Sequence, residues 1–243
     1  MEIDVNADIG EGFKNDDNLF SYISSCNIAC GGHAGDKKSI NKSIQLAIKN
    51  QVKIGAHPSF PDKLNFGRKF MTISENDLKA SLTMQINSII NLANKYNKKI
   101  HHVKPHGALY NIAFHDKKIS EIIIKSVKNL SYEVCLFAQF KSQLSNLALN
   151  SGIKVFNEVF IDREYNDDLT LIQRENKSAI STDLNKINKK VLNIVKKNQL
   201  LSLNNIKMDV QAQTYCIHGD NPKALNIMKS LKSFLKSKNI GIK

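Results

Sequence analysis

The sequence predicts an α/β fold, a closed or nearly closed parallel β/α barrel with about seven strand-helix units. Short apolar runs alternate along the chain with segments whose apolar residues recur at helical spacing. The apolar runs carry few polar residues at their centres, which is typical of parallel strands covered by helices. A doubly wound open sheet is the alternative arrangement of the same units.

Length and composition indicate one domain over residues 1–243. With 42% hydrophobic residues and only 4 prolines, the chain can bury a full core and shows no linker. Its start, Met1-Glu2-Ile3-Asp4, lacks the basic and apolar pattern of a signal peptide, and no apolar run reaches membrane-spanning length. We therefore expect a cytoplasmic protein. The four cysteines form no CxxC pair, so we expect reduced thiols.

The elements follow from the periodicity of the apolar residues. Strands are expected over residues 2–7, 27–30, 52–56, 100–103, 133–138, 153–160 and 210–217. Apolar stripes predict helices over residues 40–48, 78–96, 119–127, 184–194 and 225–235, with a further helix after Gly107. Asp36 and Ser74 are expected to cap the first two, and Asn221, followed by Pro222, to cap the last.

The net charge of +13 raises the question of nucleic-acid binding. Almost all the positive charge is lysine spread over the predicted helices, and no aromatic residues alternate with it. We therefore expect solvated helix faces and no nucleic-acid partner. Arginine occurs only at 68, 163 and 174, in loops after strands, where its planar fork suits a carboxylate or phosphate.

The stretch from His101 to Tyr110 is the centre of the predicted site. Pro105 ends a strand and Gly107 allows a turn, so Lys104 and His106 are expected at a strand-to-helix junction. Chemistry in parallel α/β folds collects at such junctions. A histidine-rich surface turn is the simpler alternative.

Five other predicted strands also end in polar residues, so the side chains should converge on one cavity. The expected group is Asp8, His33, His57, Lys104, His106, Glu158 and His218. Taken singly, Asp8 and Glu11 are also explained as loop-capping carboxylates and His57 as a buried structural histidine. Gly10-x-Gly12 lacks the third glycine of a dinucleotide fingerprint, and no GxxxxGK[ST] phosphate loop occurs.

Longer motifs resemble the LamB/YcsF family, whose members serve as the A subunit of bacterial 5-oxoprolinase. The motifs are Asn6-Ala7-Asp8-x-Gly10-Glu11-Gly12-Phe13, Asn27-Ile28-Ala29-Cys30-Gly31-x-His33-Ala34-Gly35-Asp36, Gly55-Ala56-His57-Pro58, Pro61-Asp62, Phe66-Gly67-Arg68, His102-Val103-Lys104-Pro105-His106-Gly107-Ala108-Leu109-Tyr110-Asn111, Glu158-Val159-Phe160-x-Asp162-Arg163 and Cys216-x-His218-Gly219-Asp220. The pattern departs from the family at Gly32, Ile161, Leu169 and Gln173.

The resemblance implies a distorted seven-stranded barrel of the glycoside hydrolase/deacetylase type. It also implies ATP-dependent opening of 5-oxoproline (pyroglutamate) to L-glutamate, a cyclic-amide hydrolase activity shared with partner subunits B and C. Because neither standard nucleotide motif is present, we expect ATP to be bound wholly or partly by the partners. A divalent cation and a homo-oligomer stay open.

The expected roles follow the chemistry of lactam hydrolysis. Asp8 or Glu158 is the candidate general base, with Glu11 beside them, and His57 or His106 the proton donor to the ring nitrogen. Lys104 is expected to face the developing negative charge. The candidate substrate-binding residues are Arg68 or Arg163 for the carboxylate, with Tyr110, His218 and Asp220.

Two other classes of function are compatible with the same residues. One is a stand-alone metal-dependent hydrolase or deacetylase, in which Asp8, His33 and His57 with a further histidine bind a divalent ion. The other is a non-catalytic substrate-binding subunit.

Overall fold

The computed structural model describes residues 1–243 and contains a closed barrel of seven parallel strands. In order around the barrel they are β1 (Glu2–Ile9), β2 (Ser25–Ala29), β3 (Lys53–His57), β4 (His102–Val103), β5 (Cys135–Gln139), β6 (Val155–Phe160) and β9 (Thr214–Ile217). Strand β9 pairs with both β6 and β1, so the sheet closes and the open-sheet alternative is wrong. All seven expected strands are present.

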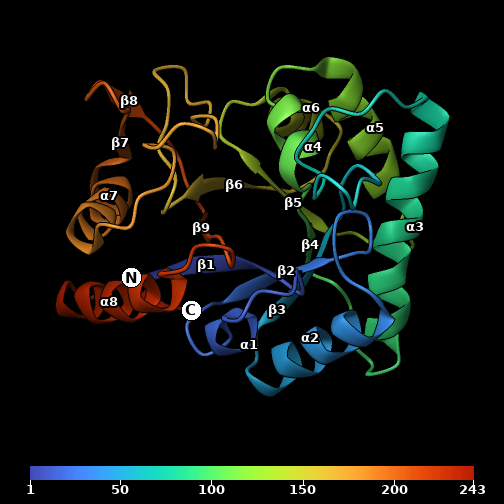
Figure 1. Cartoon of the computed structure of the whole chain (residues 1–243), viewed down its shortest axis with the longest axis horizontal. Helices are drawn as coiled ribbons and strands as arrows, with labels where there is room; N and C mark the ends of the chain where they lie inside the picture. Colours follow the sequence, from blue (N-terminus) through green and yellow to red (C-terminus); the bar gives the residue numbers. More distant parts are fainter.

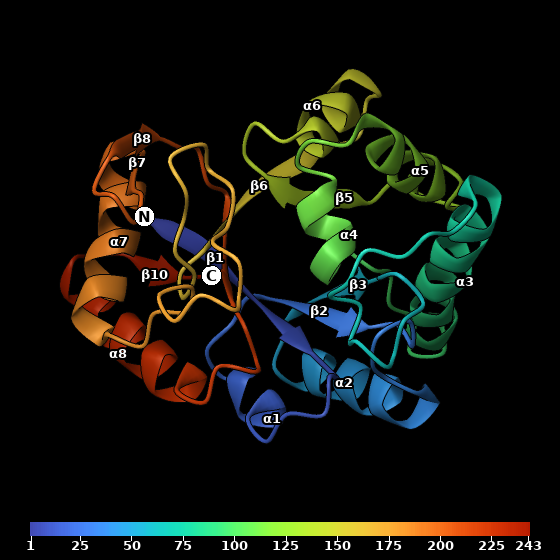
Figure 2. The ribbon, with the colours of Figure 1, turned by 45° about the horizontal axis from the view of Figure 1, so that its top comes forward.

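Helices surround the strands (Figure 1). They are α1 (Asp16–Leu19), α2 (Lys37–Lys49), α3 (Glu75–Asn94), α4 (Gly107–Ile112), α5 (Lys117–Lys128), α6 (Gln143–Asn150), α7 (Leu184–Lys197) and α8 (Ala224–Ser237). Figure 2 shows α2, α3 and α5 on one side of the barrel and α7 and α8 on the other. None of these helices has the length and apolarity needed to cross a bilayer.

The barrel is distorted on the side between β6 and β9. There the chain makes a long excursion that includes α7 and an antiparallel hairpin of β7 (Gln199–Leu201) and β8 (Lys207–Asp209). The expected strand over 210–217 therefore enters the barrel only at Thr214. At the end of the chain, β10 (Gly241–Ile242) pairs with Glu2 and Ile3 of β1, so the two termini lie together.

Two of the three predicted helix caps are confirmed. The Asp36 side chain accepts a hydrogen bond from the Ser39 amide at 2.7 Å, and Ser74 accepts one from the Asp77 amide at 3.1 Å. The third prediction is wrong, because α8 begins at Ala224. Asn221 Oδ1 accepts from the Lys223 amide at 3.0 Å, in the turn before α8, and the Asn221 side-chain amide donates to Asp162 Oδ2 at 3.1 Å, which ties two strand-end loops together.

The apolar core lies between the strands and the helices, in one cluster of 61 buried residues. Strand β1 shows the pattern: Val5 and Ala7 belong to this cluster, while Asn6 donates to Thr214 on the neighbouring strand β9 at 2.7 Å and to Glu158 on β6, one strand further, at 2.8 Å. The barrel interior thus holds more polar side chains than the apolar character of the predicted strands indicated. Polar groups are tolerated there because side chains from nearby strands satisfy one another's hydrogen bonds.

Candidate active site

A cavity of about 560 Å³ lies at the carboxyl ends of the barrel strands. Of the seven side chains expected to converge, five line it: Asp8, His57, Lys104, His106 and His218. The other two contact residues that line the cavity. The His33 ring stacks on the His106 ring with their centroids 3.6 Å apart, and Glu158 Oε1 lies 3.1 Å from Lys104 Nζ. The predicted convergence at one end of the barrel is therefore what the structure shows.

Lys104 is the centre of a buried ion-pair network. Its Nζ donates to Asp8 Oδ1 at 2.9 Å and lies 3.0 Å from Cys216 Sγ, with only 1% of the residue exposed. Burial lowers the pKa of Lys104, but the nearby charge of Asp8 and then Cys216 and Glu158 hold it well above its usual value. Lys104 is therefore an ammonium ion at neutral pH.

The two carboxylates beside Lys104 have different surroundings. Burial raises the pKa of Asp8, but the charges of His57 and Lys104 outweigh burial and keep the pKa well below its usual range. Asp8 faces the cavity. Glu158 does not line it, and its second oxygen accepts from the Tyr110 hydroxyl at 2.6 Å. Of the two candidate bases, Asp8 is the one that substrate can reach.

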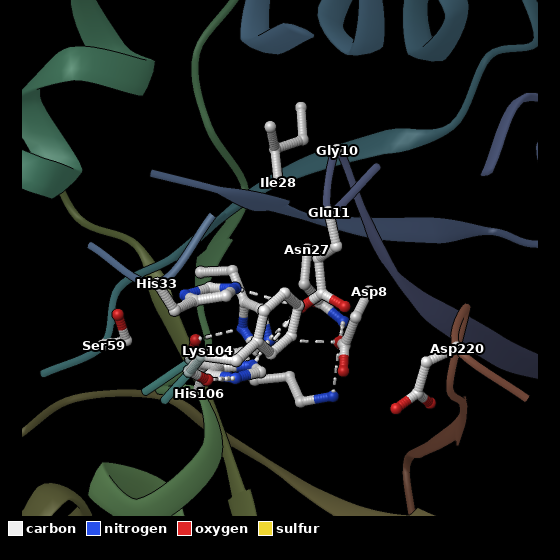
Figure 3. A network of polar contacts seen from close by, with 12 residues as sticks. Asp8, Gly10, Glu11, Asn27, Ile28, His33, Ser59, Lys104, His106 and Asp220 are labelled. Carbon is white, nitrogen blue, oxygen red and sulfur yellow. Dashed lines mark hydrogen bonds and ion pairs between the residues drawn. The ribbon is translucent and has the colours of Figure 1, made fainter. Parts of the chain in front are cut away.

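Glu11 and three histidines form a second cluster beside this network. One ligand atom from each of Glu11, His33, His57 and His106 lies within 4.8 Å of the others. Figure 3 shows Glu11, His33 and His106 turned toward one another, with Asp8 and Lys104 on one flank. Two of the sequence-based metal candidates, His33 and His57, belong to this cluster. Asp8 does not, because its Oδ1 is held by Lys104 and Asn27.

The turn at Gly107 positions Lys104 and His106. Gly107 has a φ of +57°, and a Cβ there would lie 2.5 Å from the Gly67 carbonyl oxygen. The Ala108 amide donates to that same oxygen at 2.9 Å. The loop containing Gly67 therefore packs directly on the start of α4.

His218 and Asp162 form a pair that the sequence did not single out. His218 Nδ1 lies 2.9 Å from Asp162 Oδ1, and Asp162 is buried while His218 lines the cavity. Burial raises the pKa of Asp162, but the interaction with His218 leaves that pKa below its usual value, so the carboxylate is ionised. His218 was expected only to bind substrate. The sequence feature that could have predicted this pair is Asp162, an acidic residue two positions after the end of β6.

All three arginines line the cavity. Arg68 and Arg174 both contact Asp220 Oδ2, at 2.6 and 2.7 Å, and remain partly exposed. Arg163 is buried, with its guanidinium donating to the carbonyl oxygens of Ala179 and Ile172. Arg68 and Arg174 are therefore the accessible cations at the mouth, and Arg174 was not among the expected site residues. The predicted residue Asp220 holds these two side chains from behind.

The chain is similar to named proteins over its whole length. The chain is 38% identical over 99% of its length to a Clostridium beijerinckii protein named as the A subunit of 5-oxoprolinase, covering 96% of that protein. It is 34% identical over its full length to the Pyrococcus horikoshii protein of the same name, covering 97% of it.

Solved structures also resemble this chain over nearly its whole length. The lactam utilization protein from Thermus thermophilus superposes with a TM-score of 0.92 at 30% identity, over 100% of this chain and 99% of that one. A family 4 carbohydrate esterase from Streptomyces lividans shares the fold at a TM-score of 0.53 and 8% identity, over 99% of this chain and 91% of that one. The LamB/YcsF family model matches residues 3–243. The chain therefore belongs to the LamB/YcsF family.

Proposed function

We propose that this protein is the A subunit of an ATP-dependent 5-oxoprolinase, which opens the lactam of 5-oxo-L-proline to L-glutamate together with subunits B and C. The observation that carries the proposal is the cavity, where arginines at the mouth face acid and base groups at the strand ends, in a chain whose full-length relatives bear that name. Its volume lies within the range of about 300–1,000 Å³ that is usual for small-molecule sites.

The substrate is a small five-membered lactam that carries one carboxylate. In the proposed complex this carboxylate contacts Arg68 or Arg174, whose guanidinium forks suit bidentate binding. Arg163 orders the neighbouring loop and adds positive charge. With the carboxylate at the mouth, the ring lies deeper, toward Lys104 and Asp8.

Lactam hydrolysis needs activation because amide resonance makes the carbonyl a poor electrophile. Phosphorylation of the carbonyl oxygen by ATP, with release of ADP, makes the ring carbon a better electrophile, so that water adds to it. The C–N bond then breaks as the ring nitrogen is protonated, and hydrolysis of the resulting γ-glutamyl phosphate by a second water gives glutamate and phosphate. Lys104 then offsets negative charge that develops on the phosphorylated oxygen or the tetrahedral intermediate. Asp8, ionised and facing the cavity, orients the attacking water.

Proton transfer to the ring nitrogen falls to a histidine in this scheme. His57 Nδ1 donates to the Lys104 carbonyl oxygen and His106 Nε2 to that of Phe66, and the remaining nitrogens of the two rings face each other at 3.0 Å, so neither is directed at a bound ring nitrogen. His218 is held through Nδ1 by Asp162, which leaves Nε2 for the cavity. We therefore assign the proton transfer to His218 in its imidazolium form, in which Nδ1–H donates to the ionised Asp162 carboxylate and Nε2–H gives its proton to the ring nitrogen.

The absence of both standard nucleotide motifs supports binding of ATP wholly or partly by subunits B and C. The decisive experiment measures glutamate released from 5-oxoproline with purified A, B and C, omitting each component in turn. We expect release only when the three subunits and ATP are present together.

Two results would favour other functions. ATP-independent hydrolysis by this chain alone would support the metal-dependent hydrolase, the class to which the histidine cluster adds weight. Full glutamate release by subunits B and C without this chain would show that it is not catalytic, as expected for a substrate-binding subunit.

A further inference from the structure

We propose that Glu11, His33, His57 and His106 form a binding site for one divalent transition-metal ion. The site is independent of the proposed reaction, because it follows from the orientation of the four side chains. Each residue comes from the end of a different strand: β1, β2, β3 and β4. An ion here joins four consecutive strand-end loops.

The hydrogen bonds of two histidines fix where their lone pairs point. His57 Nδ1 lies 2.7 Å from the Lys104 carbonyl oxygen, and His106 Nε2 lies 3.0 Å from the Phe66 carbonyl oxygen. A carbonyl oxygen only accepts, so each of these ring nitrogens carries the proton. His57 Nε2 and His106 Nδ1 therefore present lone pairs.

These two lone-pair atoms face each other at 3.0 Å. With a lone pair on each nitrogen no hydrogen lies on this line, so the contact is favourable only when a proton or a metal ion lies between or beside the two nitrogens. Asp8 Oδ1, 3.4 Å from His57 Nε2, adds negative charge at the same place. Glu11 Oε1 is 3.4 Å from His106 Nδ1 and 4.0 Å from His57 Nε2. A carboxylate oxygen therefore joins the two lone pairs at the same point.

His33 completes the set. Its Nε2 lies 3.0 Å from Glu11 Oε1, and its Nδ1 is buried without a hydrogen-bond partner. No acceptor outside the cluster dictates its tautomer, so Nε2 is free to present a lone pair to an ion. Its neighbours are close on two sides, since its ring stacks on His106 and meets Phe66 edge-on.

The spacing of the four atoms matches tetrahedral coordination. Ligands bound to zinc at about 2.0–2.1 Å stand about 3.3–3.4 Å apart at the corners of a tetrahedron. The individual separations given above run from 3.0 to 4.0 Å, and none of the six exceeds 4.8 Å. Small shifts of the side chains therefore convert the cluster into a first coordination sphere.

The electrostatics also favour a cation. His33 and His106 are buried, and burial disfavours the charged form of an imidazole relative to the neutral form that binds metals. Burial and the charge of Asp8 raise the pKa of Glu11. A divalent ion offsets both effects at Glu11. Three imidazoles and one carboxylate suit Zn²⁺ or Co²⁺ better than Mg²⁺ or Ca²⁺.

The test uses full-length protein made without a His-tag and stripped of metal. Titration with CoCl₂, followed by visible absorption, and with ZnCl₂, followed by calorimetry, should show one equivalent bound with a tetrahedral cobalt spectrum. Glu11→Gln and His106→Gln should each weaken binding more than about 100-fold, because even outer-sphere partners are worth about 10- to 100-fold. Zinc should raise the melting temperature of the wild type and leave that of these two variants unchanged.

The matched control is His115→Gln, the same substitution at an exposed histidine outside the cluster. It should bind metal like wild type. Circular dichroism of the metal-free variants checks that they fold; if His106→Gln does not, the near-isosteric Glu11→Gln decides. A wild type that binds no stoichiometric metal, or a Glu11→Gln variant that binds like wild type, would overturn the proposal, whatever the outcome of the glutamate-release assay.

Discussion

Lys104 combines two roles that a single substitution disturbs together. Its ammonium neutralises two buried carboxylates, Asp8 and Glu158, at 2.9 and 3.1 Å. Removing one partner of a buried ion pair costs roughly 3–5 kcal/mol, because the other charge is left uncompensated. The structure thus adds a stability cost to the catalytic role expected from the sequence.

We predict that Lys104→Met lowers both the free energy of unfolding and the turnover of 5-oxoproline. The double variant Lys104→Met/Glu158→Gln also removes the buried carboxylate that the first substitution leaves without a partner. It should therefore recover part of the lost free energy of unfolding. Turnover should stay about 10²- to 10³-fold below wild type, since the charge facing the oxyanion is still missing. Urea unfolding and glutamate release measure the two effects separately. A stable double variant that retains near wild-type turnover would show that Lys104 is structural.

Asp162 is a positioning residue for His218. Asp162→Asn keeps the size of the side chain but removes the carboxylate that fixes the His218 ring. We expect turnover to fall about 10²- to 10⁴-fold with little change in KM, because the loss concerns proton transfer and not binding. Steady-state kinetics make the distinction. Asn221→Ala, which also removes a contact of Asp162 but leaves His218 Nδ1 in place, is the control. A large rise in KM at unchanged kcat would assign the pair to binding.

At the scale of elements, the strand-to-helix turn between β4 and α4 is the most constrained junction. Gly107 has positive φ and touches the Gly67 carbonyl, whereas Gly152, after α6, has a φ of +78° with open space around its Cβ position. Alanine substitutions at these two glycines therefore distinguish the cost of backbone strain from the cost of steric contact.

Gly107→Ala should destabilise the protein by roughly 2–5 kcal/mol, combining left-handed backbone strain with overpacking against the Gly67 loop. Gly152→Ala should cost only the strain, about 1–2 kcal/mol. Chemical denaturation of both variants provides the comparison. Equal losses at the two sites would mean that the loop at Gly67 yields freely, and that the turn does not hold His106 in place.

For the whole molecule, the net charge of +13 is the property most easily taken as evidence of nucleic-acid binding. Lysines such as Lys42 and Lys117 are exposed and pair with acidic neighbours on the surface. We predict that binding to duplex or single-stranded DNA, measured by fluorescence anisotropy, is weak at low salt and absent near physiological salt, about 150 mM, because only non-specific phosphate contacts are available. Tight, sequence-selective binding at that salt would contradict the enzyme assignment.

Much of the fold was readable from the sequence because each βα unit has its own periodic signal. The seven strands and the amphipathic helices appear where the apolar spacing predicts them, as do the caps at Asp36 and Ser74. Short elements such as α6 and the β7–β8 hairpin were missed, since their few residues carry too little pattern. Asn221 was predicted as the cap, but α8 begins two residues beyond Pro222, and Asn221 caps the preceding turn while its amide bonds Asp162, a contact that local spacing cannot show.

The sequence alone determined which side chains gather at the strand ends, because parallel strands bring every carboxyl end to one edge. Only the tertiary structure decided how those side chains are paired. It placed Asp8 with Lys104, moved Glu11 and His106 into the histidine cluster, and joined Asp162 to His218. These pairings depend on the closure of the barrel and on distances of a few ångströms between residues far apart in the chain, which no local pattern encodes.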